Sequence, residues 1–266
     1  MNTENNIKDF NINGLACHIQ GTGEPLVMIH GIMSDSDFFS DCASLLAKRY
    51  TVITYDRRAY GKSEGSFSDY SVSTQAQDVR DIIKAAGFSS AFILGNSAGG
   101  LIGLELALTT PEYVRSLLML EPSLGYIPEE QKKLKDWNRL LNEYKNNNQS
   151  KQVLPEFARV IGAPKSENTS FSMAALRQTY KNLNAFLEGE LNEVQSYLPD
   201  RERVTASDVP MSILVTERGR DSIFATSSVS AAEVLGLPVY HLPGYHNTIK
   251  DMPSDCAVIL HGILSL

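Results

Sequence analysis

Gly95-Asn96-Ser97-Ala98-Gly99-Gly100 is the stretch that decides the fold of this chain. It follows the apolar run 91–94, which predicts a short buried strand, and it precedes the apolar run 101–108, which predicts a helix. A G-x-S-x-G pentapeptide between a strand and a helix predicts a nucleophile elbow, a sharp turn that exposes its serine at the carboxyl edge of a sheet. We therefore expect strained backbone angles at Ser97, with Gly95 and Gly99 allowing strand and helix to approach closely.

Length and composition limit the class of protein. The 266 residues, 42% of them apolar, suit one large α/β domain with an insertion. The net charge of −7 without a basic cluster indicates no nucleic-acid or anionic-membrane partner. No apolar run reaches membrane-spanning length, and the polar start at 1–6 lacks a signal-peptide core, so we expect a cytoplasmic protein. Cys17, Cys42 and Cys256 are scattered, which predicts buried free thiols rather than a zinc site.

Strand-like and helix-like patterns alternate along the chain. Residues 7–20 predict a hairpin that turns at Asn13-Gly14. Thr74 and Gln77 match a capping box, which predicts that a helix opens there, and a later helix is expected over 228–235. The alternation predicts an α/β fold with a doubly wound, mostly parallel sheet and helices on both faces. Apolar runs place its further strands at 26–29, 51–55, 91–94, 117–120, 209–216 and 237–242.

Residues 123–205 differ in character from the rest of the chain. They contain three helical patterns, a polar break at 146–150 and no strand-like run. This predicts an all-helical cap inserted into a core formed by 1–122 and 206–266. Most aromatic residues of the cap are expected to pack on the core, and a minority to line a pocket.

Two polar loops leave predicted strands near the elbow. His30-Gly31-Ile32 follows the strand at 26–29, so the backbone N–H of Ile32 can lie beside that of Ala98 and form an oxyanion hole with it. His30 is interpreted as a structural histidine that fixes this loop. The loop that begins at Asp56 and runs through 56–63 is expected to form a structural network of ion pairs and hydrogen bonds.

These features resemble the α/β-hydrolase superfamily across nearly the whole chain. The matching segments are His30-Gly31, 56–63, 95–99 and Gly244-Tyr245-His246. The resemblance implies a Ser–acid–His triad in that chain order, without metal or organic cofactor. One departure is Ala59, where the family usually has glycine, and another is Tyr245-His246, where many members have Gly-His.

The resemblance assigns Ser97 as nucleophile and His246 as base. A serine hydroxyl is a poor nucleophile until a base takes its proton. Of five histidines, only His246 is expected in a loop just past the carboxyl end of a late strand. A serine at the elbow argues against the haloalkane-dehalogenase and epoxide-hydrolase branches, which form an alkyl-enzyme ester through an aspartate.

Three carboxylates are candidates for the acid that orients His246. Glu121 directly follows the strand at 117–120, Glu217 directly follows the strand at 209–216, and Asp221 is nearer the more usual family position. Glu121-Pro122 resembles a Glu-Pro pair in a subset of these hydrolases that includes zearalenone-type lactonases. A glutamate that ends an apolar strand also needs a partner to offset its burial. We favour Glu121 and keep Asp221 and Glu217 as alternatives.

The leading hypothesis is a serine hydrolase that cleaves a small carboxylic ester, thioester or lactone through an acyl-enzyme on Ser97. Carbon–carbon bond hydrolases, cofactor-free haloperoxidases and acyltransferases use the same machinery, and fold and triad do not choose among them. A ligand-binding sensor that kept the hydrolase fold is a further alternative. The expected partner is a small-molecule substrate, and the sequence indicates no oligomeric state.

Overall fold

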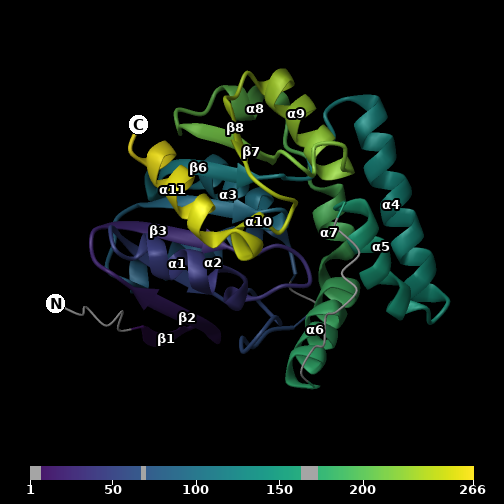
Figure 1. Ribbon diagram of the computed structural model, residues 1–266, viewed down its shortest axis with the longest axis horizontal. Helices are drawn as coiled ribbons and strands as arrows, with labels where there is room; N and C mark the ends of the chain where they lie inside the picture. The colour runs from purple at the N-terminus through teal and green to yellow at the C-terminus, as the bar shows by residue number, and fades with distance from the viewer. Residues whose placement is uncertain (1–6, 67–69, 163–172) are drawn as a thin grey trace.

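An eight-stranded sheet lies at the centre of the computed structural model, which describes residues 7–66, 70–162 and 173–266 (Figure 1). Its spatial order among the described residues is β1-β2-β4-β3-β5-β6-β7-β8. The pairs β1–β2 and β2–β4 are antiparallel and the other neighbours are parallel. The strands are β1 (Lys8–Ile12), β2 (Leu15–Gln20), β3 (Glu24–Ile29), β4 (Tyr50–Tyr55), β5 (Ala91–Asn96), β6 (Val114–Leu120), β7 (Met211–Thr216) and β8 (Val239–Leu242).

Helices cover both faces of the sheet. One face packs against α1 (Ser40–Leu46), α10 (Thr248–Asp251) and α11 (Pro253–Leu264). The 3₁₀ turn η1 (Ser36–Phe39) leads directly into α1. The other face packs against α2 (Val72–Ala85), α3 (Ala98–Thr109) and α9 (Ile223–Leu235); a second 3₁₀ turn, η3 (Pro111–Tyr113), leads into β6.

The central strand β3 shows how the sheet serves two cores. Leu26 and Met28 belong to the core beneath α1 and α11, whereas Val27 and Ile29 belong to the core beneath α2 and α3. Side chains alternate between the faces of a strand, and a strand covered on both sides is therefore apolar throughout. All four side chains are fully buried. The predicted fold class, a doubly wound and mostly parallel sheet, is confirmed.

The chain between β6 and β7 is helical where the structure describes it. Figure 1 shows α4, α5, α6 and α7 together beyond one end of the sheet. Trp137 of α4 packs against Phe224 of α9 with ring centroids 5.3 Å apart, which ties this helical region to the core. Its elements are α4 (Pro128–Asn146), the 3₁₀ turn η4 (Ser150–Gln152), α5 (Val153–Val160), α6 (Met173–Ala185), the π-helical turn η5 (Phe186–Glu190), α7 (Leu191–Ser196) and α8 (Arg201–Thr205).

Two predicted helix starts were wrong. The helix α2 begins at Val72, because Ser71 is its N-cap and accepts a hydrogen bond from the Thr74 backbone N–H at 2.9 Å. The helix α9 begins well before residue 228, after the N-cap Ser222. Both early turns bury a large apolar side chain, Val72 in α2 and Phe224 in α9, so tertiary packing extends each helix toward its N-terminus.

Two smaller expectations from the sequence, a tight turn and three buried thiols, are confirmed. The Asn13-Gly14 turn has positive φ at both residues and joins β1 to β2 as predicted. Cys17, Cys42 and Cys256 are buried free thiols, also as predicted. Within the described residues no helix has the length and apolarity needed to cross a membrane. The same part of the chain holds no cluster of three or more metal-ligating side chains.

Candidate active site

Ser97 occupies a strained turn between β5 and α3. Its backbone angles are φ 54° and ψ −121°, a conformation that an L-residue adopts only when the surrounding structure imposes it. A Cβ added to Gly95 would lie 2.3 Å from the Gly99 carbonyl oxygen, and one added to Gly99 would lie 2.1 Å from the Ile29 carbonyl oxygen. The two glycines therefore permit the close approach of strand and helix that creates the turn.

His246 and Glu121 form a buried pair beside the elbow. The His246 Nδ1 lies 2.5 Å from Glu121 Oε2, and the two side chains are 1% and 0% exposed. The other carboxylate oxygen, Oε1, accepts hydrogen bonds from the backbone N–H of Thr216 at 2.8 Å and from its hydroxyl at 2.6 Å. Burial alone would raise the pKa of Glu121, but the His246 and Thr216 hydrogen bonds together hold that pKa below its ordinary value.

The second ring nitrogen of His246 faces the cavity that also contains Ser97. With Nδ1 engaged by Glu121, Nε2 is buried and has no hydrogen-bond partner among the described residues. The imidazole packs beside Phe224 of α9, with ring centroids 5.1 Å apart, and Phe157 of α5 meets it edge-on at 6.1 Å. These contacts fix the plane of the ring, so Nε2 is oriented toward the cavity rather than rotating in solvent.

The two alternative acids lie elsewhere. The Asp221 side chain is 96% exposed and approaches only Arg220, at 3.9 Å, among its ion-pair partners in the described residues. Glu217 is also exposed. Only Glu121, of these three carboxylates, is brought against His246.

The loop after β3 packs against the elbow. A Cβ added to Gly31 would lie 3.1 Å from Ser97 Cβ, and Ile32 lines the same cavity as Ser97. Ala98 is the first residue of α3, where backbone N–H groups lack partners within the helix. The two residues expected to form an oxyanion hole therefore flank Ser97 from two different elements.

His30 holds this loop in place. Its Nε2 accepts the Arg57 backbone N–H at 3.0 Å, so the ring proton is on Nδ1, which donates to the Gly31 carbonyl oxygen at 2.9 Å. Complete burial, reinforced by the Arg57 charge, lowers the pKa of His30 well below its ordinary value. His30 is therefore a neutral structural residue, as its place in the sequence indicates.

The loop 56–63 forms the expected structural network. Asp56 accepts hydrogen bonds from the Ser36 and Lys62 backbone N–H groups at 2.8 and 2.7 Å. The guanidinium of Arg57 is fully buried and binds both carboxylate oxygens of Glu190, a residue of η5. Arg57 also donates to the Gly31 carbonyl oxygen at 2.8 Å, which connects the helical region between β6 and β7 to the loop beside Ser97.

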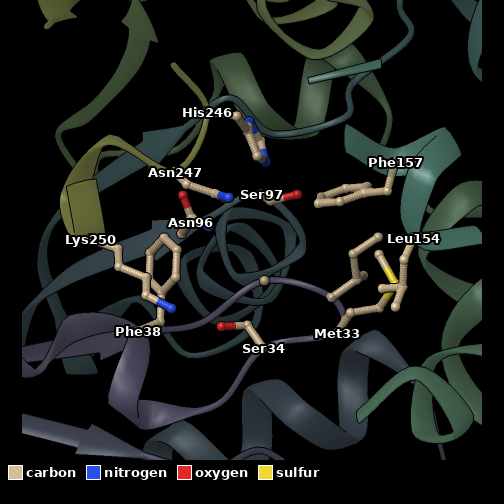
Figure 2. Close-up of a pocket in the computed structure, with 12 residues that line it drawn as sticks. Met33, Ser34, Phe38, Asn96, Ser97, Leu154, Phe157, His246, Asn247 and Lys250 are labelled. Carbon is tan, nitrogen blue, oxygen red and sulfur yellow. The ribbon is translucent and has the colours of Figure 1, made fainter. Parts of the chain in front are cut away.

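Ser97 and His246 line a cavity of about 180 Å³. Figure 2 shows Ser97 near its centre, with Met33, Leu154 and Phe157 to one side and Asn96, Asn247 and Lys250 to the other. Pockets for drug-sized ligands start at about 300 Å³. The cavity therefore suits a small molecule.

Comparison with known proteins agrees with this geometry. A family model described as the alpha/beta hydrolase fold matches residues 24–201, more than half of the chain. The chain belongs to the α/β-hydrolase family. An uncharacterized hydrolase of Bacillus subtilis, YraK, is 28% identical over 253 residues, which cover 92% of this chain and 90% of that protein. A fluoroacetate dehalogenase from a Burkholderia species is 32% identical over 116 residues, covering 42% of this chain and 38% of that protein.

A solved structure extends the likeness to the whole fold. A hydrolase from Pseudomonas aeruginosa PA01 superposes with a TM-score of 0.76 at 17% identity, covering 99% of this chain and all of that one. At that identity the likeness concerns the fold alone. The family match and the relative named as a hydrolase support a hydrolase of the α/β fold as the coarse function of the chain.

Several residues of this α/β-hydrolase site were missed by sequence reasoning. Asn96 directly precedes Ser97 in the G-x-S-x-G motif, so its place in the sequence could have predicted that it borders the same cavity. Phe157 was recognised only as one of the cap aromatics. Lys250 and Glu190 carry no local signal, because each reaches the site or its support only through the tertiary fold.

Proposed function

We propose that this α/β-hydrolase is a serine hydrolase that cleaves a small carboxylic ester, thioester or lactone through an acyl-enzyme on Ser97. The observation that carries the proposal is the buried Glu121–His246 pair, whose remaining ring nitrogen opens into the cavity lined by Ser97. A nucleophile, a base and a group that orients the base are the three parts that serine hydrolysis requires.

In the proposed mechanism, Ser97 Oγ attacks the carbonyl carbon and His246 Nε2 takes the hydroxyl proton. The carbonyl oxygen becomes an oxyanion, which accepts hydrogen bonds from the backbone N–H groups of Ile32 and Ala98. His246 then gives its proton to the departing oxygen or sulfur, which leaves an ester on Ser97. Water attacks this acyl-enzyme with His246 again as base, and the acid product departs.

No Ser97–His246 hydrogen bond is present among the described residues, although both side chains line one cavity. Such contacts commonly tighten only when substrate is bound. A rotation of the Ser97 side chain about its Cα–Cβ bond is the adjustment that the mechanism requires.

Glu121 acts through His246 in this scheme. Its lowered pKa keeps the carboxylate ionised at neutral pH, where it holds the proton on Nδ1 and stabilises the imidazolium that forms during attack. Thr216 anchors the second carboxylate oxygen, so the carboxylate cannot rotate away from the ring.

The serine at the elbow favours acyl transfer over dehalogenation. The relative named as a fluoroacetate dehalogenase matches only part of this chain. Branches that displace a halide form an ester through an elbow aspartate, whereas this chain has Ser97 at that position.

Turnover of short esters tests the proposal. Acid release from short methyl esters and thioesters would be followed by pH-stat for the wild type, for Ser97→Ala and for the control Ser265→Ala at the end of α11. We expect a loss of at least about 10³-fold in kcat for Ser97→Ala and wild-type rates for the control. A folded Ser97→Ala protein that retains wild-type turnover would refute the assignment of Ser97.

A further inference from the structure

The cavity around Ser97 is apolar on one side and carries most of its polar side chains on the other. Met33, Leu154 and Phe157 form the apolar side in Figure 2. The opposite side carries polar groups from two elements, Asn96 at the end of β5 and Asn247 and Lys250 at the N-cap and in the body of α10. The ring of Phe38 lies on this side too, and Ser34 lies at the lower edge of the same cavity (Figure 2). A site that accepted only apolar esters would gain nothing from this second group of side chains.

Asn96 is buried on the polar side without a full set of partners. It is 3% exposed, it lines the cavity, and its Oδ1 has no hydrogen-bond partner in the described part of the chain. Buried polar atoms in native proteins are nearly always satisfied, so an orphaned one at a cavity wall points to a ligand. As placed, Oδ1 is an acceptor and pairs with a donor, not with a carboxylate; the amide turned by 180° about its last bond directs its NH₂ donor to the cavity and can hydrogen-bond a carboxylate oxygen.

Lys250 gives this side of the cavity its charge. It belongs to α10 and is the one permanently charged side chain among the described lining residues, which include no carboxylate. No ion pair involves Lys250 within the described residues. The charge acts on the neighbouring Asp251: burial raises the pKa of that carboxyl, and the Lys250 charge opposes the rise. A cation at the mouth of a small cavity, in a chain of net charge −7, attracts and orients an anion.

We propose that the substrate carries a carboxylate, which binds on the side of Lys250 and Asn96, and a short apolar group on the side of Phe157. The ester or lactone carbonyl then lies between the two at Ser97. A cavity of about 180 Å³ suits a molecule with a few carbon atoms on each side, as in a monoester of a short dicarboxylic acid. The reaction rests on the proposed function, but the recognition of the carboxylate does not.

Two esters of matched shape test this recognition. Monomethyl succinate and methyl levulinate differ only in that a carboxylate oxygen of the first is a methyl group in the second. We expect wild-type kcat/KM to favour monomethyl succinate by about tenfold or more. Lys250→Met should bring that ratio close to one, Lys250→Arg should preserve most of it, and the exposed control Lys48→Met should leave it unchanged.

Binding to Ser97→Ala separates recognition from catalysis. By calorimetry, we expect this variant to bind monomethyl succinate about tenfold more tightly than methyl levulinate, and the difference to vanish when Lys250→Met is added. If binding discriminates but the wild type hydrolyses neither ester, the carboxylate site stands and the proposed reaction falls. If both esters bind and react equally well in folded protein, or if Lys250→Met keeps the preference, the carboxylate site is overturned and the reaction stands.

Discussion

Glu190 of η5, in the helical region between β6 and β7, and Arg57, in the loop after β4, form an ion pair in which neither side chain is exposed. The Tyr60 hydroxyl donates to the same carboxylate, and Arg57 also binds the Gly31 carbonyl oxygen beside Ser97. The position of this helical region and the shape of the loop after β3 therefore depend on one connected network. Because both charges are withdrawn from water, removing either one leaves the other uncompensated.

We expect Glu190→Gln to lower the free energy of unfolding by about 3–5 kcal/mol, because Arg57 then remains buried without its counter-charge. Urea denaturation measures the loss. The matched control is Asp136→Asn, which removes an exposed ion pair with Lys132 on α4 and should leave the unfolding midpoint unchanged. A wild-type midpoint for Glu190→Gln would show that the network contributes little to stability.

The backbone strain at Ser97 predicts a gain in stability when glycine replaces the serine. A residue held at φ 54° and ψ −121° costs of the order of 1–3 kcal/mol, and glycine avoids most of that cost. The greater unfolded-state entropy of glycine offsets part of this gain. We therefore expect the free energy of unfolding of Ser97→Gly to exceed that of Ser97→Ala by about 1 kcal/mol. At Ser230, in the middle of α9, the order should reverse, with Ser230→Gly less stable to unfolding than Ser230→Ala, because glycine destabilises a helix interior.

Acid should remove the stabilisation that Glu121 contributes. Its pKa in the folded chain lies below the ordinary value of 4.5, so the ionised carboxylate stabilises the fold above that pH. The contribution is lost as pH falls from about 4.5 through the lowered pKa. We therefore expect the unfolding free energy of wild type to fall more steeply in this range than that of Glu121→Gln. Parallel pH profiles of the two proteins would contradict the pairing with His246.

Substitution of the three carboxylates should rank them clearly. If Glu121 orients His246, Glu121→Gln should lower kcat by roughly 10³–10⁴-fold, because the imidazole loses its tautomer and its charge partner. Asp221→Asn and Glu217→Gln change exposed side chains and should keep near-normal kcat. Thermal melting of each variant excludes unfolding as the cause. A folded Glu121→Gln enzyme with full activity, beside an inactive Asp221→Asn enzyme, would reverse the assignment.

Much of the core was predictable from sequence because local patterns reflect its burial. The strands β3, β5 and β6 contain apolar runs whose side chains are covered on both faces of the sheet. The continuous apolar character and the short length of each run identify it as a strand without knowledge of its neighbours. The spatial order of the strands and the true starts of α2 and α9 depend on long-range packing. For α9, that packing is the contact of Phe224 with Trp137 and His246, residues distant in sequence.

The candidate site divides in the same way. Ser97 and His246 were identifiable because a motif and a loop position set them apart. Three carboxylates followed strand ends, and only the sheet register, which pairs Leu120 with Leu214, brings Thr216 and His246 to Glu121. Glu190 could not be assigned, because nothing near it in sequence reveals that Arg57 lies opposite it.

Covalent labelling by a fluorophosphonate is the sharpest test of Ser97 as the nucleophile, because this probe reacts readily with an activated serine held beside a base. Peptide mass spectrometry after labelling should find the adduct on Ser97 in the wild type, a strongly reduced labelling rate in Glu121→Gln, and no adduct at that position in Ser97→Ala. A folded wild-type protein whose Ser97 stays unmodified, under conditions that fully label a control esterase, would contradict the account.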